Sequence, residues 1–71
     1  MPDSVYKVIE LIGTSEVSWE DAANNAIKTA SKTLEDLRIA EVTAQDLKIE
    51  DGKVVMYRTK LRLSFRFREK S

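Results

Sequence analysis

The chain has 71 residues, and its 12 basic and 12 acidic side chains cancel to a formal net charge of +0. It contains no cysteine and no histidine. Their absence excludes disulfides, thiolate metal sites, and the commonest general base and metal ligand of proteins. Because neither a nucleophile–histidine triad nor a zinc centre can be built from this inventory, we expect a protein that is not an enzyme.

This length allows a single domain, spanning residues 1–71. A domain so small buries only about 60% of the surface that its unfolded chain exposes, so its own core gives little stability. Without cysteine for disulfides, we expect oligomerisation to stabilise it. No apolar run approaches the ~20 residues that cross a bilayer. The opening Met1-Pro2-Asp3-Ser4 lacks the basic and apolar regions of a secretory signal. We therefore expect a cytoplasmic homo-oligomer without membrane contact.

The first half of the chain predicts a strand followed by a helix. Val5–Ile12 is rich in β-branched and aromatic residues, and Gly13-Thr14-Ser15 is expected to end this strand in a turn. Ser18 is a good helix N-cap, with Asp21 three residues later as in a capping box. The helix, of about 17 residues, then carries an apolar stripe made of Trp19, Ala22, Ala23, Ala26, Ile27, Ala30 and Leu34. We interpret Trp19 as a core anchor.

The second half predicts a long β-hairpin. Asp51-Gly52 favours a two-residue turn in which both residues have positive φ, and it joins Leu37–Glu50 to Lys53–Arg68. With that loop, the face toward the helix pairs Ala40 with Leu63, Val42 with Leu61, Ala44 with Thr59 and Asp46 with Tyr57. The other face pairs Ile39 with Ser64, Glu41 with Arg62, Thr43 with Lys60, Gln45 with Arg58, Leu47 with Met56 and Ile49 with Val54.

The predicted fold class is α+β, in the order β-α-β-β, with a three-stranded antiparallel sheet wrapped around one helix. Strands of ~14–16 residues extend for roughly 50 Å, whereas the helix covers only ~25 Å. The face away from the helix also keeps apolar residues at both ends, namely Leu37, Ile39, Leu47, Ile49, Val54 and Met56. Exposed apolar surface of this kind marks a contact with a partner or ligand, so we expect the unit to assemble with copies of itself.

Two groups of charged residues have a functional and a plain interpretation. Alternate positions of the last strand place five cations on one face, either as an anion or nucleic-acid site or as a salt-bridged face: Arg58, Lys60, Arg62, Arg66 and Arg68. We favour the salt-bridged face and no nucleic-acid partner, because the aromatic residues that would stack on bases fall on the opposite face. Asp46, Glu50 and Asp51 have oxygen ligands for Ca²⁺, but we favour simple solvation of these acids.

Several short segments, in this order, resemble the dodecin family from about residue 5 to residue 67. No single motif is specific, and the similarity lies in the ordered series. The segments are Val5-Tyr6-Lys7-Val8-Ile9-Glu10, Gly13-Thr14-Ser15, Ser18-Trp19-Glu20, Ala26, Ala30-Ser31-Lys32-Thr33-Leu34, Ala40-Glu41-Val42, Gly52-Lys53 and the strand from Tyr57 to Phe65.

The resemblance implies a subunit of which twelve copies close a hollow shell that stores flavin (FMN, FAD or riboflavin) at subunit contacts. Some members also bind coenzyme A. It further implies a cofactor-binding position formed by Ile39 and Arg58, with Gln45 adjacent. Ile39 stands where the family has a flavin-stacking tryptophan, Arg58 where it has a glutamine, and Ala44 where flavin binders have an acidic residue. Loss of the stacking ring predicts flavin affinity lowered by orders of magnitude.

Three functions therefore remain open on the sequence. The first is a dodecin-like shell that binds and stores a small ligand. The second is a shell that binds Ca²⁺ or is purely structural, as associated with a branch of the family without the tryptophan. The third, which we favour least, is an anion or nucleic-acid binder that uses the cations of the last strand.

Overall fold

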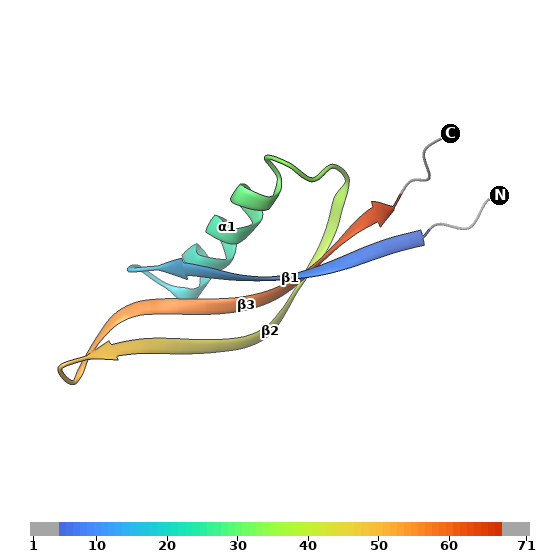
Figure 1. Cartoon of the computed structure of the whole chain (residues 1–71). Coiled ribbons are helices and arrows are strands. Elements are labelled where there is room, and N and C mark those ends of the chain that lie inside the picture. The colour runs from blue at the N-terminus through green and yellow to red at the C-terminus, as the bar shows by residue number, and fades with distance from the viewer. Residues whose placement is uncertain (1–4, 68–71) are drawn as a thin grey trace.

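The computed structural model describes residues 5–67, which form one helix and three strands. The elements are β1 (Val5–Ser15), α1 (Trp19–Ala30), β2 (Leu37–Glu50) and β3 (Lys53–Phe67). The strands form one antiparallel sheet in the order β1-β3-β2, and α1 lies across one face of it (Figure 1). The predicted β-α-β-β fold is confirmed. Met1 to Ser4 and Arg68 lie outside the described residues.

β1 is longer than predicted. It continues through Gly13 and Thr14 to Ser15, and Gly13 pairs with Thr59 of β3. The prediction that Gly13-Thr14-Ser15 forms a turn is therefore wrong. The glycine instead permits close packing, because a Cβ at Gly13 would lie 2.9 Å from the carbonyl carbon of Ala22 and 3.0 Å from the Cβ of Ala26.

α1 begins as predicted and ends early. The Ser18 hydroxyl accepts a hydrogen bond from the backbone N–H of Asp21 at 3.0 Å, which satisfies one free donor of the first turn. The Asp21 carboxylate does not complete a capping box, since it accepts a hydrogen bond from the Ser15 hydroxyl at 2.7 Å. The helix has 12 residues rather than about 17. It ends where the hydroxyl of Ser31 donates to the carbonyl of Lys28, a local bond that competes with helical bonding.

The hairpin between β2 and β3 has the predicted strands and turn. Asp51 and Gly52 both have positive φ, at 52° and 73°. Leu37, however, pairs with Phe65 and packs against the core, so its predicted place on the apolar face away from the helix is wrong. The chain between α1 and β2 also passes through Asp36 at a φ of 59°, which the sequence pattern did not indicate.

The hydrophobic core is small and lies between α1 and the centre of the sheet. Its buried residues are Ala22, Ala26, Ala30, Leu61 and Leu63. The 12 residues of α1 span ~18 Å, whereas the 14 residues of β2 extend for about 48 Å. The hairpin therefore runs well beyond the helix (Figure 1). Within residues 5–67, the helix is not long and apolar enough to cross a membrane.

The sheet face opposite α1, which we call the outer face, is open to solvent. β3 presents its even-numbered residues there, and successive side chains of a strand alternate between faces. Ile39, Ile49 and Val54 are 66%, 61% and 47% exposed. This agrees with the predicted apolar residues at the two ends of the outer face. Leu47 is an exception, because it pairs with Tyr57 and so lies on the helix side, where the prediction is wrong.

Candidate functional site

Ile39 and Arg58 both lie on the outer face, as predicted, but they do not meet within one chain. Ile39 pairs with Ser64 of β3, which is six residues from Arg58 along the strand. At about 3.4 Å per residue this separates the two positions by ~20 Å. A site that contains both side chains therefore needs a second copy of the chain.

Gln45 does not join them. A β-bulge at Thr43 interrupts the predicted register, so Gln45 pairs with Thr59 and points to the helix side of the sheet. The predicted opposition of Gln45 and Arg58 is wrong. The hydroxyl of Thr43 donates to the backbone carbonyl of Lys60 at 3.3 Å, which holds the bulged segment against β3.

Other pairs of the predicted register change with the bulge. From residue 39 to residue 42 the predicted pairs are confirmed, and so is the pair of Ile49 with Val54. Between them the partners move by one position. The observed pairs of this stretch are Ala44 with Lys60, Gln45 with Thr59, Asp46 with Arg58, Leu47 with Tyr57 and Lys48 with Met56.

The bulge places Asp46 opposite Arg58. Two hydrogen bonds join the side chains, from Arg58 Nε to Asp46 Oδ1 at 2.6 Å and from a terminal guanidinium nitrogen to Oδ2 at 2.8 Å. This is the two-pronged geometry in which guanidinium and carboxylate match best. These hydrogen bonds hold the pKa of the Asp46 carboxyl below its ordinary value of 3.8 and raise the pKa of Arg58. Arg58 thus already has an anionic partner.

The remaining cations of this part of β3 are also matched by acids. Glu10 on β1 lies 3.9 Å from Lys60 and 3.5 Å from Arg62. Glu41 stands opposite Arg62 as predicted, but the carboxylate that contacts Arg62 is that of Glu10. The plain interpretation of this face, as a salt-bridged surface, is confirmed for Arg58, Lys60 and Arg62. Within residues 5–67, Arg66 makes no ion pair. Arg68 lies outside the described residues.

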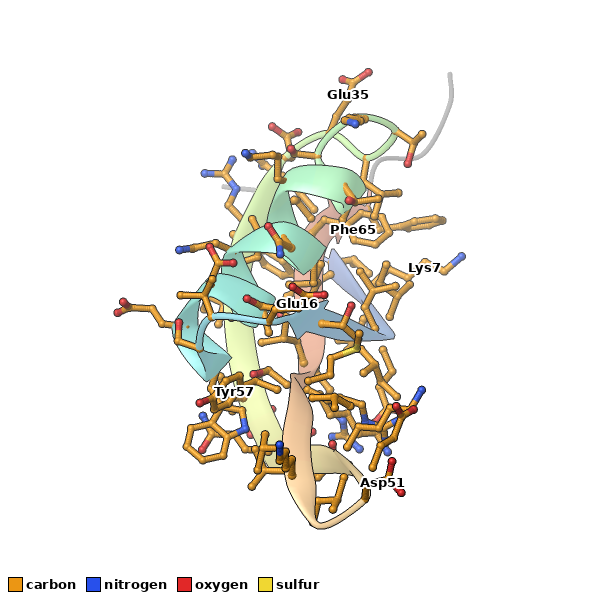
Figure 2. The ribbon with its side chains drawn as sticks, turned by 90° about the vertical axis from the view of Figure 1, so that its left-hand side faces the viewer. Lys7, Glu16, Glu35, Asp51, Tyr57 and Phe65 are labelled. Atoms are coloured by element: carbon orange, nitrogen blue, oxygen red, sulfur yellow. The ribbon has the colours of Figure 1, made fainter. Side chains whose placement is uncertain are left out.

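Asp46 also connects the hairpin to the start of α1. Its backbone carbonyl accepts a hydrogen bond from the indole N–H of Trp19 at 3.1 Å. The Trp19 ring meets Tyr57 edge-on, with centroids 5.4 Å apart, and Figure 2 shows Tyr57 beneath the start of the helix. Thr59 donates to the backbone carbonyl of Trp19 at 2.9 Å. Trp19 is half-buried and lies outside the core cluster, so its interpretation as a core anchor is wrong.

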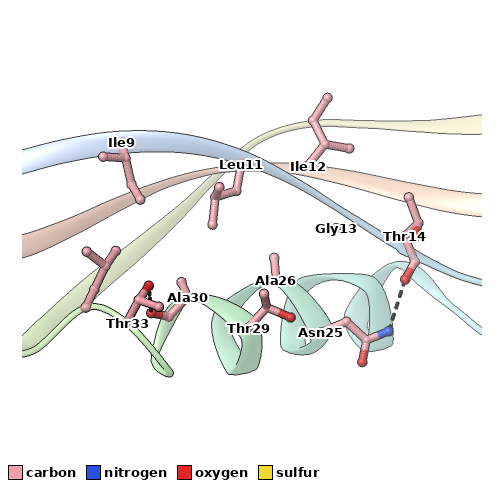
Figure 3. A pocket seen from close by; sticks show the side chains of 11 residues that line it. Ile9, Leu11, Ile12, Gly13, Thr14, Asn25, Ala26, Thr29, Ala30 and Thr33 are labelled. Carbon is pink, nitrogen blue, oxygen red and sulfur yellow. Dashed lines mark hydrogen bonds between the residues drawn. The ribbon is translucent and has the colours of Figure 1, made fainter.

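A groove that the sequence did not indicate runs between β1 and α1, with a volume of about 470 Å³. Figure 3 shows Ile9, Leu11 and Ile12 along its strand side. Its helix side is lined by small residues, and at one end the Asn25 amide donates to the carbonyl of Thr14 at 3.0 Å. The groove is mainly apolar and contains no charged side chain. The only sequence signal for it is the small size of the helix residues that face β1.

The described part of one chain does not gather a metal site. No group of three or more acidic side chains within residues 5–67 is placed to hold an ion. Asp46 is bonded to Arg58, and Glu50 lies 3.6 Å from Lys48. Asp51 stands at the tip of the hairpin (Figure 2). Asp46 and Glu50 therefore take part in ion pairs, where the sequence interpretation expected simple solvation.

Comparison with known proteins agrees with this fold. A curated relative, the calcium dodecin of Mycobacterium tuberculosis (strain ATCC 25618 / H37Rv), is 46% identical over 65 residues, which are 92% of each protein. The structure of dodecin from Streptomyces coelicolor superposes with a TM-score of 0.93 at 40% identity, covering 99% of this chain and 100% of that one.

A second solved structure is that of the calcium-chelating immunodominant antigen, calcium dodecin, from Mycobacterium tuberculosis, described as having a novel calcium-binding site. It matches with a TM-score of 0.83 at 46% identity, over 96% of this chain and 97% of that one. The family model described as Dodecin matches residues 5–68. The chain belongs to the dodecin family.

Proposed function

We propose that this chain is one subunit of a hollow dodecameric shell that binds a small ligand or ion and catalyses no reaction. The observation that carries this proposal is the exposed apolar surface of the outer face, where Ile39 is 66% and Ile49 is 61% exposed. Residues 5–67 include five buried hydrophobic residues, and a chain with so small a core gains stability when assembly removes exposed apolar surface from water. The shell would be cytoplasmic, with residues 1–71 as one domain and no nucleic-acid partner.

The separation of Ile39 from Arg58 supports a ligand position between subunits. Because these residues stand ~20 Å apart along one sheet, a small ligand contacts both only when two copies contribute one each. Ligand binding at this position would therefore depend on assembly.

The residues at this position do not fit a flavin well. Ile39 offers no aromatic surface on which an isoalloxazine ring can stack, and one hydrogen-bonding edge of the Arg58 guanidinium is taken by Asp46. The proposal is therefore a shell with weak flavin binding. Coenzyme A carries phosphate, as flavin mononucleotide does. Its phosphate would meet the Arg58 guanidinium, which is already bonded to Asp46.

Calcium is the second candidate ligand, and the relative named calcium dodecin, at 46% identity, favours it. Since residues 5–67 of a single chain contain no three-acid group, the oxygen ligands would have to come from more than one subunit. Acids on the exposed strand β2, such as Glu41 and Glu50, are accessible for this purpose.

Native mass spectrometry of the purified protein tests the proposal. A mass near twelve subunits that also carries a small organic ligand or bound calcium supports a binding shell. Repeating the measurement after EGTA treatment, and again after adding Ca²⁺, separates the two candidates. A calcium-dependent mass increment or rise in Tm supports the ion. A stable monomer at micromolar concentration would overturn the shell, and a dodecamer that takes up neither ligand would overturn the binding function.

A further inference from the structure

The outer face of β3 carries a row of cations whose charge is cancelled by acids from the two neighbouring strands. β1 contributes Glu10, which contacts Lys60 and Arg62. β2 contributes Asp46, which contacts Arg58 with both carboxylate oxygens, at the shortest distances of any ion pair within residues 5–67. The two acids hold their cations differently. Glu10 contacts at 3.5 Å or more, whereas Asp46 fills one whole edge of the guanidinium.

The identity of the group opposite Arg58 depends on a single inserted residue. Without the bulge at Thr43, the continuous register from Val42 onward would place the neutral amide of Gln45 there. With the bulge, the carboxylate of Asp46 takes that place and Gln45 points to the helix side. A bulge that re-aims side chains in this way is a specific feature of a strand, and here it exchanges a neutral neighbour of Arg58 for a charged one.

The planar fork of a guanidinium binds the paired oxygens of carboxylates and phosphates. We propose that Asp46, placed by the Thr43 bulge, is the specificity-determining residue of the outer face, because its carboxylate occupies the Arg58 fork and keeps small phosphate-bearing anions from binding there. This inference rests on the proposed function, because it takes the outer face to be the surface that binds the ligand. It adds that this ligand is neutral or cationic where it meets Arg58.

The structure also supplies a reporter for this position. The sequence contains one tryptophan, and the indole of that residue, Trp19, donates to the backbone carbonyl of Asp46. A change of the strand at Asp46 therefore reaches the environment of the fluorophore through one hydrogen bond. Trp19 lies on the helix side, so an anion at Arg58 does not touch the ring itself.

The experiment compares binding of inorganic pyrophosphate to four assembled proteins by calorimetry, with Trp19 fluorescence as a second readout. They are the wild type, Asp46→Asn, Glu41→Gln and the double variant Asp46→Asn with Arg58→Gln. Glu41 is the matched control, since it lies on the same strand and face and its change removes the same charge, without contact to Arg58. We expect Asp46→Asn to bind about fivefold more tightly than wild type, the range of an exposed ion pair.

Glu41→Gln is expected to stay within about twofold of wild type, and loss of Arg58 is expected to abolish the gain. Equal binding by wild type and Asp46→Asn would overturn the proposal. An equal gain in Glu41→Gln would also overturn it, because general surface charge would then explain the effect. Native mass spectrometry of each variant reports assembly independently, so a failure of the shell is distinguished from a failure of the Asp46 proposal.

Discussion

Gly13 of β1 lies directly against the backbone of Ala22 in α1. A Cβ added to Gly13 would stand 2.9 Å from the Ala22 carbonyl carbon and closer still to its oxygen. The obstacle is backbone, which cannot turn aside as a flexible side chain can. The approach brings the alanine-rich face of the helix onto the sheet and sets the distance at which the small core is packed.

Replacement of Gly13 by alanine is therefore expected to lower the free energy of unfolding by about 3 kcal/mol or more, since overpacking forces the helix and strand apart. Gly52→Ala is the matched control. A Cβ there meets nothing within 4 Å, and only the positive φ of 73° opposes it, a cost of about 1 kcal/mol. Urea denaturation at one protein concentration checks both variants, and equal losses would contradict a steric role for Gly13.

Among the leucines, truncation of Leu61 is expected to lower the free energy of unfolding the most. Its side chain is 0% exposed and packs against α1 at the centre of the core, so Leu61→Ala should cost about 2–5 kcal/mol through lost burial and the cavity left behind. Leu47→Ala, on the neighbouring strand and 39% exposed, should cost about 1 kcal/mol or less in the unassembled chain. Thermal unfolding at matched protomer concentration measures both, because assembly contributes to stability.

Asp46 should make stability depend on pH in the acid range. Its folded-state pKa lies below the ordinary value of 3.8, so its ion pair contributes stability that is present above about pH 4 and is lost as the pH falls through the folded-state pKa. The gap in Tm between wild type and Asp46→Asn should therefore be constant near neutral pH and shrink below pH 4.

The expected effect of the Asp46–Arg58 ion pair on Tm is small, because both side chains are exposed to solvent. Glu41→Gln again serves as the control, as Glu41 makes no ion pair within the described residues. A Tm gap for Asp46→Asn that grew on acidification would contradict the assigned pair.

Ile39→Trp is expected to raise the affinity for riboflavin. A stacked ring contributes about 0.5–1.5 kcal/mol beyond area burial, which is roughly a two- to tenfold gain for each ring that contacts the ligand. Ile49→Trp is the control, since Ile49 is a similarly exposed isoleucine at the other end of the outer face. Quenching of riboflavin fluorescence measures both. Equal affinity in the two variants would show that Ile39 does not stand at the flavin position.

Local chemistry made part of the fold predictable. Asp51-Gly52 tolerates the two positive φ values of the hairpin turn, and that turn sets the boundaries of β2 and β3. Ser18 marks the start of α1 because its hydroxyl can bond a free N–H of the first turn. The exposure of Ile39 and its place opposite the helix followed from the alternation of the strand. These features depend on contacts between residues that are close in sequence or paired next to the turn.

Tertiary structure decided what local patterns do not encode. The sequence pattern predicts a turn at Gly13, but in the structure Gly13 is part of β1, where it packs against the backbone of Ala22 in α1. The candidate site was also not predictable from local patterns. Side chains of a strand alternate between the two faces of the sheet, so the one bulged residue at Thr43 moves Gln45 away from Arg58 and places Asp46 opposite it. The sequence by itself determined the order of the helix and strands and the position of the hairpin turn. Only the packing of β2 on β3 decided which charge Arg58 meets, since a bulge is fixed by the fit of two whole strands.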